Sequence, residues 1–322
     1  MNRSKQHRPA FTLLELVVVL AILAVVTTLA VRSLDGLEDQ SRYDKTTRGM
    51  EEFAAAVVGS PADRAADGTR TVTGFVADMG RLPRAVERGD LTLAELWENL
   101  GTTYDVRPAV FANGVPLALE DPQVLVAGGW RGPYLRLPIG ATTWLDGWGN
   151  PMTSPADASP PDPDGTGYSR LRGAGGSAII AAGVEVHSVR HLGANGRQDS
   201  ADSGYDRDGG LDFTDRFSAS LTGQVEVMDG ESPVMIAPGD TVTVCVFGPH
   251  PSNPQQILVT SAVVPFTANP VIWSISGATV GPRVVRAYFN ATTTTATALR
   301  RSTVKHLTLR SGVNLVDLTI DR

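Results

Sequence analysis

The chain has 322 residues, a formal net charge of −6 and a single cysteine, Cys245. One cysteine cannot form an intramolecular disulfide, so disulfide bonds do not hold this fold together. The acidic balance gives no sign of a nucleic-acid-binding surface, and we expect no nucleic-acid partner.

A long apolar run near the N-terminus is the most informative feature of the sequence. From Leu16 to Val31 only Thr27 and Thr28 are not apolar. A helix of this length crosses the roughly 30 Å hydrocarbon core of a bilayer, so we expect a transmembrane helix over 11–31.

The charges around the run predict its orientation. Basic residues precede it and acidic residues follow it: Arg3, Lys5 and Arg8, then Asp35, Glu38 and Asp39. Because positive flanks stay in the cytoplasm, we expect a single-pass inner-membrane protein with a cytoplasmic N-terminus. The bulk of the chain would then be periplasmic or part of an extracytoplasmic filament.

Glu15 is a carboxylate near the start of the expected transmembrane helix 11–31, directly before Leu16. An acid in hydrocarbon costs a few kcal/mol, so it usually indicates a function and a partner. The alternative is an ordinary signal anchor that tolerates one acid near its edge. The small residue Ala10 stands before the run, directly ahead of Phe11, whereas a secretory signal carries its cleavage site after the run.

This segment resembles the type IV prepilin class, in which a short basic leader and a small residue precede Phe-Thr-Leu-Leu-Glu. The resemblance implies that a prepilin peptidase removes the leader 1–10 between Ala10 and Phe11 and methylates the new amine. The class usually has Gly where this chain has Ala10. It further implies that Glu15 pairs with the N-terminal ammonium of a neighbouring subunit in a filament, which satisfies a costly buried charge.

Helical patterning continues beyond the apolar run. No proline occurs between Ser33 and Val58, and Gly59-Ser60-Pro61 ends the pattern. A helix over 11–58 would be roughly 70 Å long. We expect it to pack on a small β-sheet pilin head at 59–212, which has a short helix at 91–100 and strands at 178–182 and 184–189.

Three elements of this head resemble the major pseudopilin of type II secretion systems, in the same order: Gly132–Leu135, Asp146–Pro151 and Leu192–Gly196. The resemblance covers residues 1 to about 212. Gly147 stands where the family often has Pro, Asn195 replaces the usual Asp, and the segment 85–126 is longer than expected. The resemblance implies a structural, non-enzymatic subunit of a homo-oligomeric pseudopilus, built on an inner-membrane assembly platform.

An acidic, Ser/Gly-rich loop near residue 200 is the candidate metal site. Calcium takes several carboxylate and carbonyl oxygens from a flexible loop. The family resemblance implies one Ca²⁺ ion, with ligands from Leu192, Asn195, Asp206 and Asp208, and Asp199 and Asp202 as further candidates. The residues alone are more typical of a solvated surface loop, since Asp, Ser and Gly are common in any surface turn.

The pattern changes at about residue 224. Short valine-rich segments separated by Pro, Gly and Asn predict an all-β sandwich module over 224–322, with Cys245 buried in one strand. The fold class expected for the whole chain is therefore α+β. We expect this module to decorate a fibre.

Two other functions remain open. A minor type IV pilin or adhesin would use the C-terminal sandwich to bind a surface or ligand. A membrane-anchored enzyme would need a catalytic site, and His187 and His191 alone have a ligand-like spacing. That spacing aligns two ligands on a helix, but here it spans an expected strand end and turn, so we rank the enzyme last.

Overall fold

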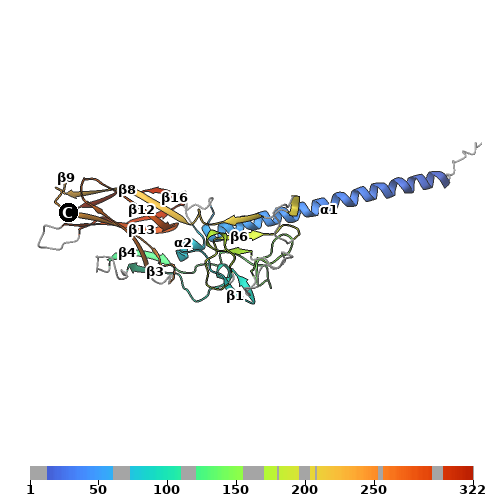
Figure 1. Cartoon of the computed structure of the whole chain (residues 1–322), viewed down its shortest axis with the longest axis horizontal. Coiled ribbons are helices and arrows are strands. Elements are labelled where there is room, and N and C mark those ends of the chain that lie inside the picture. Colours follow the sequence, from blue (N-terminus) through green and yellow to red (C-terminus); the bar gives the residue numbers. More distant parts are fainter. Residues whose placement is uncertain are drawn as a thin grey trace, which may run out of the picture.

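The computed structural model is an elongated molecule in which one long helix projects from an α+β body (Figure 1). Side chains are not described at 30–36, 107–109, 121–122 and 206. The structure describes the backbone of residues 13–60, 73–109, 121–154, 170–179, 181–195, 204–206, 209–252, 257–291 and 300–321.

Helix α1 runs over Leu13–Val58 without interruption. It ends where the sequence predicts, because Gly59 takes a left-handed conformation (φ 84°) and its N–H donates to the Ala55 carbonyl at 2.9 Å. Glycine adopts that conformation without the steric cost that a side chain would add. The helix is roughly 70 Å long at 1.5 Å per residue.

The second half of α1 packs on the head. Met50, Phe53 and Val57 are buried in the core, and the Phe53 ring contacts Trp144 and Phe213. Around this contact lie α2 (Phe75–Met79), β1 (Val86–Arg88), β2 (Asp90–Thr92) and an antiparallel sheet of β5 (Leu171–Arg172), β6 (Ser188–His191) and β7 (Gly209–Asp212).

Two local predictions in the head are wrong. The expected helix at 91–100 is instead β2 followed by a 3-10 turn at Ala94–Leu96, because Leu91 exchanges two backbone hydrogen bonds with Ser154 (2.8 and 2.9 Å). The strands expected at 178–182 and 184–189 reduce to isolated bridges and the start of β6. Gly183 turns the chain there in a left-handed conformation (φ 84°).

The C-terminal region is all-β, as predicted, and consists of two sheets that share one core. The first contains β8 (Ser218–Asp229), β9 (Ser232–Pro233), β12 (Val271–Thr279), β16 (Gly312–Leu315) and β17 (Leu318–Asp321). The second contains β10 (Thr241–Pro249), β11 (Ile257–Pro265), β13 (Gly281–Asn290), β14 (Arg300–Arg301) and β15 (Lys305–Leu309).

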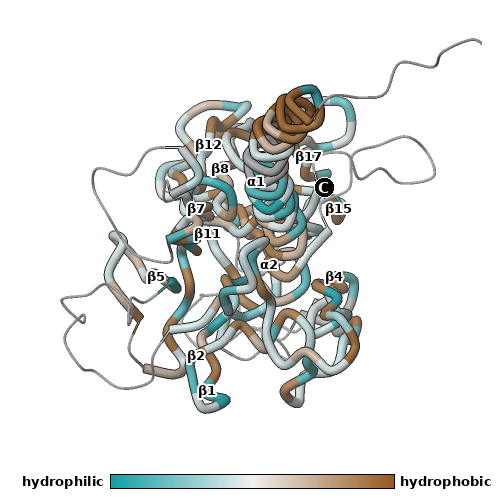
Figure 2. Tube along the Cα trace, turned by 90° about the vertical axis from the view of Figure 1, so that its right-hand side faces the viewer, coloured by the Kyte–Doolittle hydropathy of each residue, from teal (hydrophilic) through white to brown (hydrophobic). Residues whose placement is uncertain are grey.

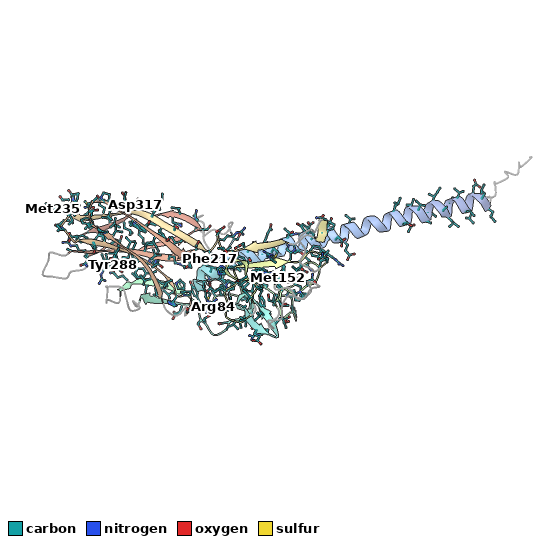
Figure 3. The ribbon with its side chains drawn as sticks, in the orientation of Figure 1. Arg84, Met152, Phe217, Met235, Tyr288 and Asp317 are labelled. Carbon is teal, nitrogen blue, oxygen red and sulfur yellow. The ribbon has the colours of Figure 1, made fainter. Side chains whose placement is uncertain are left out.

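A third layer covers the outer face of the second sheet. The hairpin of β3 (Asp105–Ala109) and β4 (Asp121–Gly128) lies against β10 and β13 (Figure 1). Its Val124 and Val126 share a buried cluster with Cys245 and Tyr288, which is labelled in Figure 3. The unexpectedly long segment 85–126 therefore supplies part of the cover for the C-terminal strands.

Cys245 is fully buried, as predicted, but it faces the hairpin rather than the space between the two sheets. Its neighbours Val244 and Val246 point to the opposite face and enter the main core. Burial raises the pKa of the Cys245 thiol to about 12, because a thiolate would be desolvated there.

Arg283 joins the head to the C-terminal sheets. Its buried guanidinium donates to the Ala77 carbonyl of α2 at 3.0 Å and to the Val280 carbonyl at 2.6 Å. Burial lowers the pKa of Arg283 to about 10, while nearby Asp78 opposes that shift. One continuous buried cluster spans both regions, and the division of the chain at about residue 224 stays a prediction.

Candidate functional site

The first part of α1 exposes large apolar side chains along its length. Figure 2 colours this end of the helix as hydrophobic. A helix that is apolar all round is typical of one that is surrounded by other apolar material. Exposed fractions lie between 46% and 82% for the large apolar residues from Leu13 to Leu29. Within the described part of the chain, we find no helix whose length and hydropathy together suffice for a membrane span.

Glu15 lies in the first turn of α1 and is exposed among these apolar residues. The other two processing and assembly residues, Ala10 and Phe11, lie outside the described residues. The structure therefore places the acid on the helix but not the predicted cleavage site.

The turn Asp146–Pro151 docks on the polar half of α1. Gly147 N–H donates to Thr46 Oγ1 at 2.8 Å, and the hydroxyl of Thr46 donates to the Arg42 carbonyl at 3.0 Å. A Cβ at Gly147 would lie 1.9 Å from the Arg42 carbonyl oxygen. Glycine thus fits where the family often has Pro, because proline has neither the N–H nor the space.

The buried carboxylate of Asp146 organises this turn from inside. It accepts the backbone N–H groups of Trp148 (3.0 Å) and Asn150 (2.8 Å), and the side-chain amide of Asn150 at 3.1 Å. Arg170 Nη1 lies 3.6 Å from its second oxygen. Each of these contacts stabilises the turn.

The Gly132–Leu135 element forms a second structural clamp. Tyr134 donates its hydroxyl to Asp78 of α2 at 3.0 Å, and Arg131 Nε donates to the same carboxylate oxygen at 3.1 Å. Burial raises the pKa values of Asp78 and Tyr134, and attraction to Arg131 partly opposes the shift at Asp78. Sequence analysis missed Asp78, because nothing in its local pattern distinguishes it from a surface acid.

The predicted calcium loop is anchored to α1 at its described end. Ala194 N–H donates to the Tyr205 carbonyl at 2.9 Å, which brings the two sides of the loop together. The Tyr205 hydroxyl donates to Gln40 Oε1 at 2.8 Å, and its ring centroid lies 6.0 Å from that of Tyr43. Sequence analysis also missed Tyr205, whose signal is a lone aromatic residue in an acidic, Ser/Gly-rich segment.

The predicted calcium ligands are only partly placed. Leu192 is buried, and Asn195 directly follows Ala194, whose N–H donates to the Tyr205 carbonyl. The backbone of Asp206 is in the 3-10 turn Gly204–Asp206. Asp199, Asp202 and Asp208 lie outside the described residues. Among the residues that the structure describes, no group of three or more His, Cys, Asp or Glu could hold a metal ion.

His187 and His191 have different surroundings. The His187 ring contacts Phe217 edge-on, with centroids 5.9 Å apart. His191 packs so tightly on β7 that a Cβ at Gly209 would lie 2.1 Å from its Nε2. Burial lowers the pKa of His191, and attraction to Asp146 opposes this shift only in part.

The comparisons with known proteins concern the N-terminus alone. Residues 5–31 match the family model of the prokaryotic N-terminal methylation motif. Neither the search of curated proteins nor that of solved structures returned a match. The N-terminal segment is therefore pilin-like and of prepilin type, which implies a membrane-anchored N-terminus, processing by a prepilin peptidase and a structural role among pilin-like subunits.

Proposed function

We propose that the chain is a structural subunit of a type II secretion-type pseudopilus, assembled from the inner membrane through α1. The observation that carries this proposal is the methylation motif at residues 5–31, together with the exposed apolar helix that follows it. The helix would be stored in the bilayer as a single span, with its N-terminus in the cytoplasm. An assembly platform would then move it into the filament core.

Two features of the head support the pseudopilin subtype over other pilin-like proteins. The Asp146–Pro151 turn and the loop that begins at Leu192 both contact the same stretch of α1, through Thr46 and Gln40. They fix the polar half of the helix to the head. The apolar half is left free to pack with other subunits.

Glu15 would set the register between subunits. An acid within an apolar interface costs free energy unless it meets a cation, and the N-terminal ammonium of a neighbour supplies one. The carboxylate therefore serves assembly and not the folding of the head, which lies far along the helix (Figure 1).

The test compares Glu15→Ala with Glu52→Ala, which removes an exposed acid from the polar half of the same helix. Fibres are quantified by cross-linking in cells that carry the assembly machinery. We expect Glu15→Ala to abolish or strongly reduce cross-linked fibres while the melting of the head is unchanged, and Glu52→Ala to assemble normally. Normal fibres from Glu15→Ala would overturn the pairing.

A minor pilin or adhesin is the second candidate. The C-terminal sheets extend beyond the end of α1 that enters the body, so the molecule has a long distal part available for contacts (Figure 1). Met235 lies at that far end and is 91% exposed (Figure 3). Met235→Glu would separate the two functions, because both kinds of subunit would still assemble and only an adhesin would lose surface binding.

A further inference from the structure

Among the described residues, the two C-terminal sheets have four edges, and three of them carry protection against pairing with another chain. Native edges are commonly blunted by charge, by bulges or by short length. The β14–β15 edge carries Arg300, Arg301 and Lys305. Strand β12 has a register shift between Ile275 and Ala278, and β16 and β17 are only four residues each.

The β11 edge has none of these devices. Strand β11 is nine residues long, pairs with β10 at all nine positions without a shift, and pairs with no other strand among the described residues. No Asp, Glu, Lys or Arg occurs between Pro251 and Pro282. The exposed fraction is 57% for Val263 and 37% for Leu258, and Ser261 is also exposed.

We propose that the β11 edge is an interaction surface that accepts an extended strand from a partner polypeptide. The outward backbone N–H and C=O groups of an edge strand are satisfied by the main chain of an added strand. This inference does not rest on the proposed filament role.

The side chains of β11 specify the chemistry of the partner strand. Side chains alternate along the unshifted strand, so Ser261 and Val263 project from one face and Leu258 from the other. Opposite residues on a shared face lie about 5 Å apart, so a partner strand would place side chains beside Ser261 and Val263 on one face and beside Leu258 on the other. None of these can neutralise a charge. The fitting partner is therefore an uncharged segment of six to nine residues, with apolar side chains at alternate positions.

The test uses a labelled synthetic peptide with the sequence of β10, Thr241–Pro249, in which Cys245 is replaced by Ser. The β10 backbone already pairs with β11 on its inner side, and the sequence is uncharged and alternates. Binding to the full chain in detergent is followed by fluorescence anisotropy. Val263→Lys puts a charge on the edge, and Val313→Lys makes the same change on β16, where Val313 is 73% exposed.

We expect the peptide to bind the unmodified chain and Val313→Lys equally, and Val263→Lys about tenfold or more weakly. Hydrogen exchange on the unmodified chain should slow at the β11 amides when the peptide is added. The proposal would be overturned by no binding, by equal binding to both variants, or by protection at sites other than β11. A chain that dimerises through this edge without peptide would also overturn it, because the occupant would be a second copy.

Discussion

At the scale of single residues, the structure explains Gly147 through contact with the helix. The N–H of Gly147 reaches Thr46, and its Cα lies against the Arg42 carbonyl. Local sequence indicates a turn at this point, but it cannot indicate that the turn docks on a helix about one hundred residues away. Turn chemistry is local, whereas the space available at a position depends on the tertiary contact.

Gly147→Ala should therefore destabilise the head. Its Cβ would lie 1.9 Å from a backbone oxygen, so the turn must move away from α1. We expect a loss of about 1 to 3 kcal/mol in the free energy of unfolding, measured by denaturant titration. Gly173→Ala is the control, because its Cβ would come no closer than 3.1 Å to any neighbouring atom, the nearest being the Ser177 hydroxyl oxygen. Equal stability of Gly147→Ala and the unmodified chain would contradict the docking.

His191 should make the stability of the head depend on pH. Burial lowers its pKa below the ordinary 6.5, so the unfolded chain binds the proton more readily than the folded chain. The contribution of neutral His191 to the stability of the head is then fully present above pH 6.5. It is lost as the pH falls toward the pKa of His191 in the folded chain. We expect His191→Leu to reduce this acid-side loss in melting temperature. An unchanged pH profile in His191→Leu would show that other groups cause it.

At the scale of elements, periodicity was a good guide wherever strands or helices bury a regular face. The end of α1 at Val58 and the strands β10, β12 and β13 lie where the pattern predicts. The helix predicted over 91–100 was wrong, because the backbone of Leu91 pairs with that of Ser154, and this long-range pairing overrides the local helix preference. The hairpin that covers Cys245 could not be predicted, because its partner strands lie more than one hundred residues away in the sequence.

The reactivity of Cys245, the single cysteine, tests whether the β3–β4 hairpin shields it from solvent. Val124→Asp would place a charge in the fully buried cluster around Cys245, and Leu125→Asp, on the next residue, would change a half-exposed side chain instead. A buried carboxylate without a partner is costly enough to detach the hairpin. We expect Cys245 to react with a thiol reagent at least about tenfold faster in Val124→Asp alone. Equal rates in both variants would mean that the hairpin does not shield the thiol.

Calcium binding by the loop 192–208 stays a prediction at this scale. Binding to the folded state alone would stabilise the chain by about 2.7 kcal/mol at a hundredfold excess over the dissociation constant. We expect the full chain in detergent to melt higher with calcium than with chelator, and Asp206→Ala to abolish the difference. Asp164→Ala, from another acidic cluster, should leave it intact. No calcium effect on the unmodified chain would favour a solvated loop.

At the scale of the whole molecule, the apolar part of α1 and the C-terminal sheets lie at opposite ends (Figure 1). The apolar half of α1 projects from one end, and the C-terminal sheets occupy the other (Figure 1). Arg283 and the β3–β4 hairpin connect the sheets to the head through a buried hydrogen bond and packed side chains. The sequence predicted both ends, but the connection between them depends on tertiary contacts that have no local pattern.

The central claim is that the chain is processed and assembled as a prepilin. Mass spectrometry of the full chain extracted from membranes that contain a prepilin peptidase tests it most directly. We predict a mature N-terminus at Phe11 carrying one methyl group, because Ala10 and Phe11 stand at the junction of the basic leader and the apolar run. An intact Met1, or a new N-terminus beyond Val31, would contradict the prepilin account.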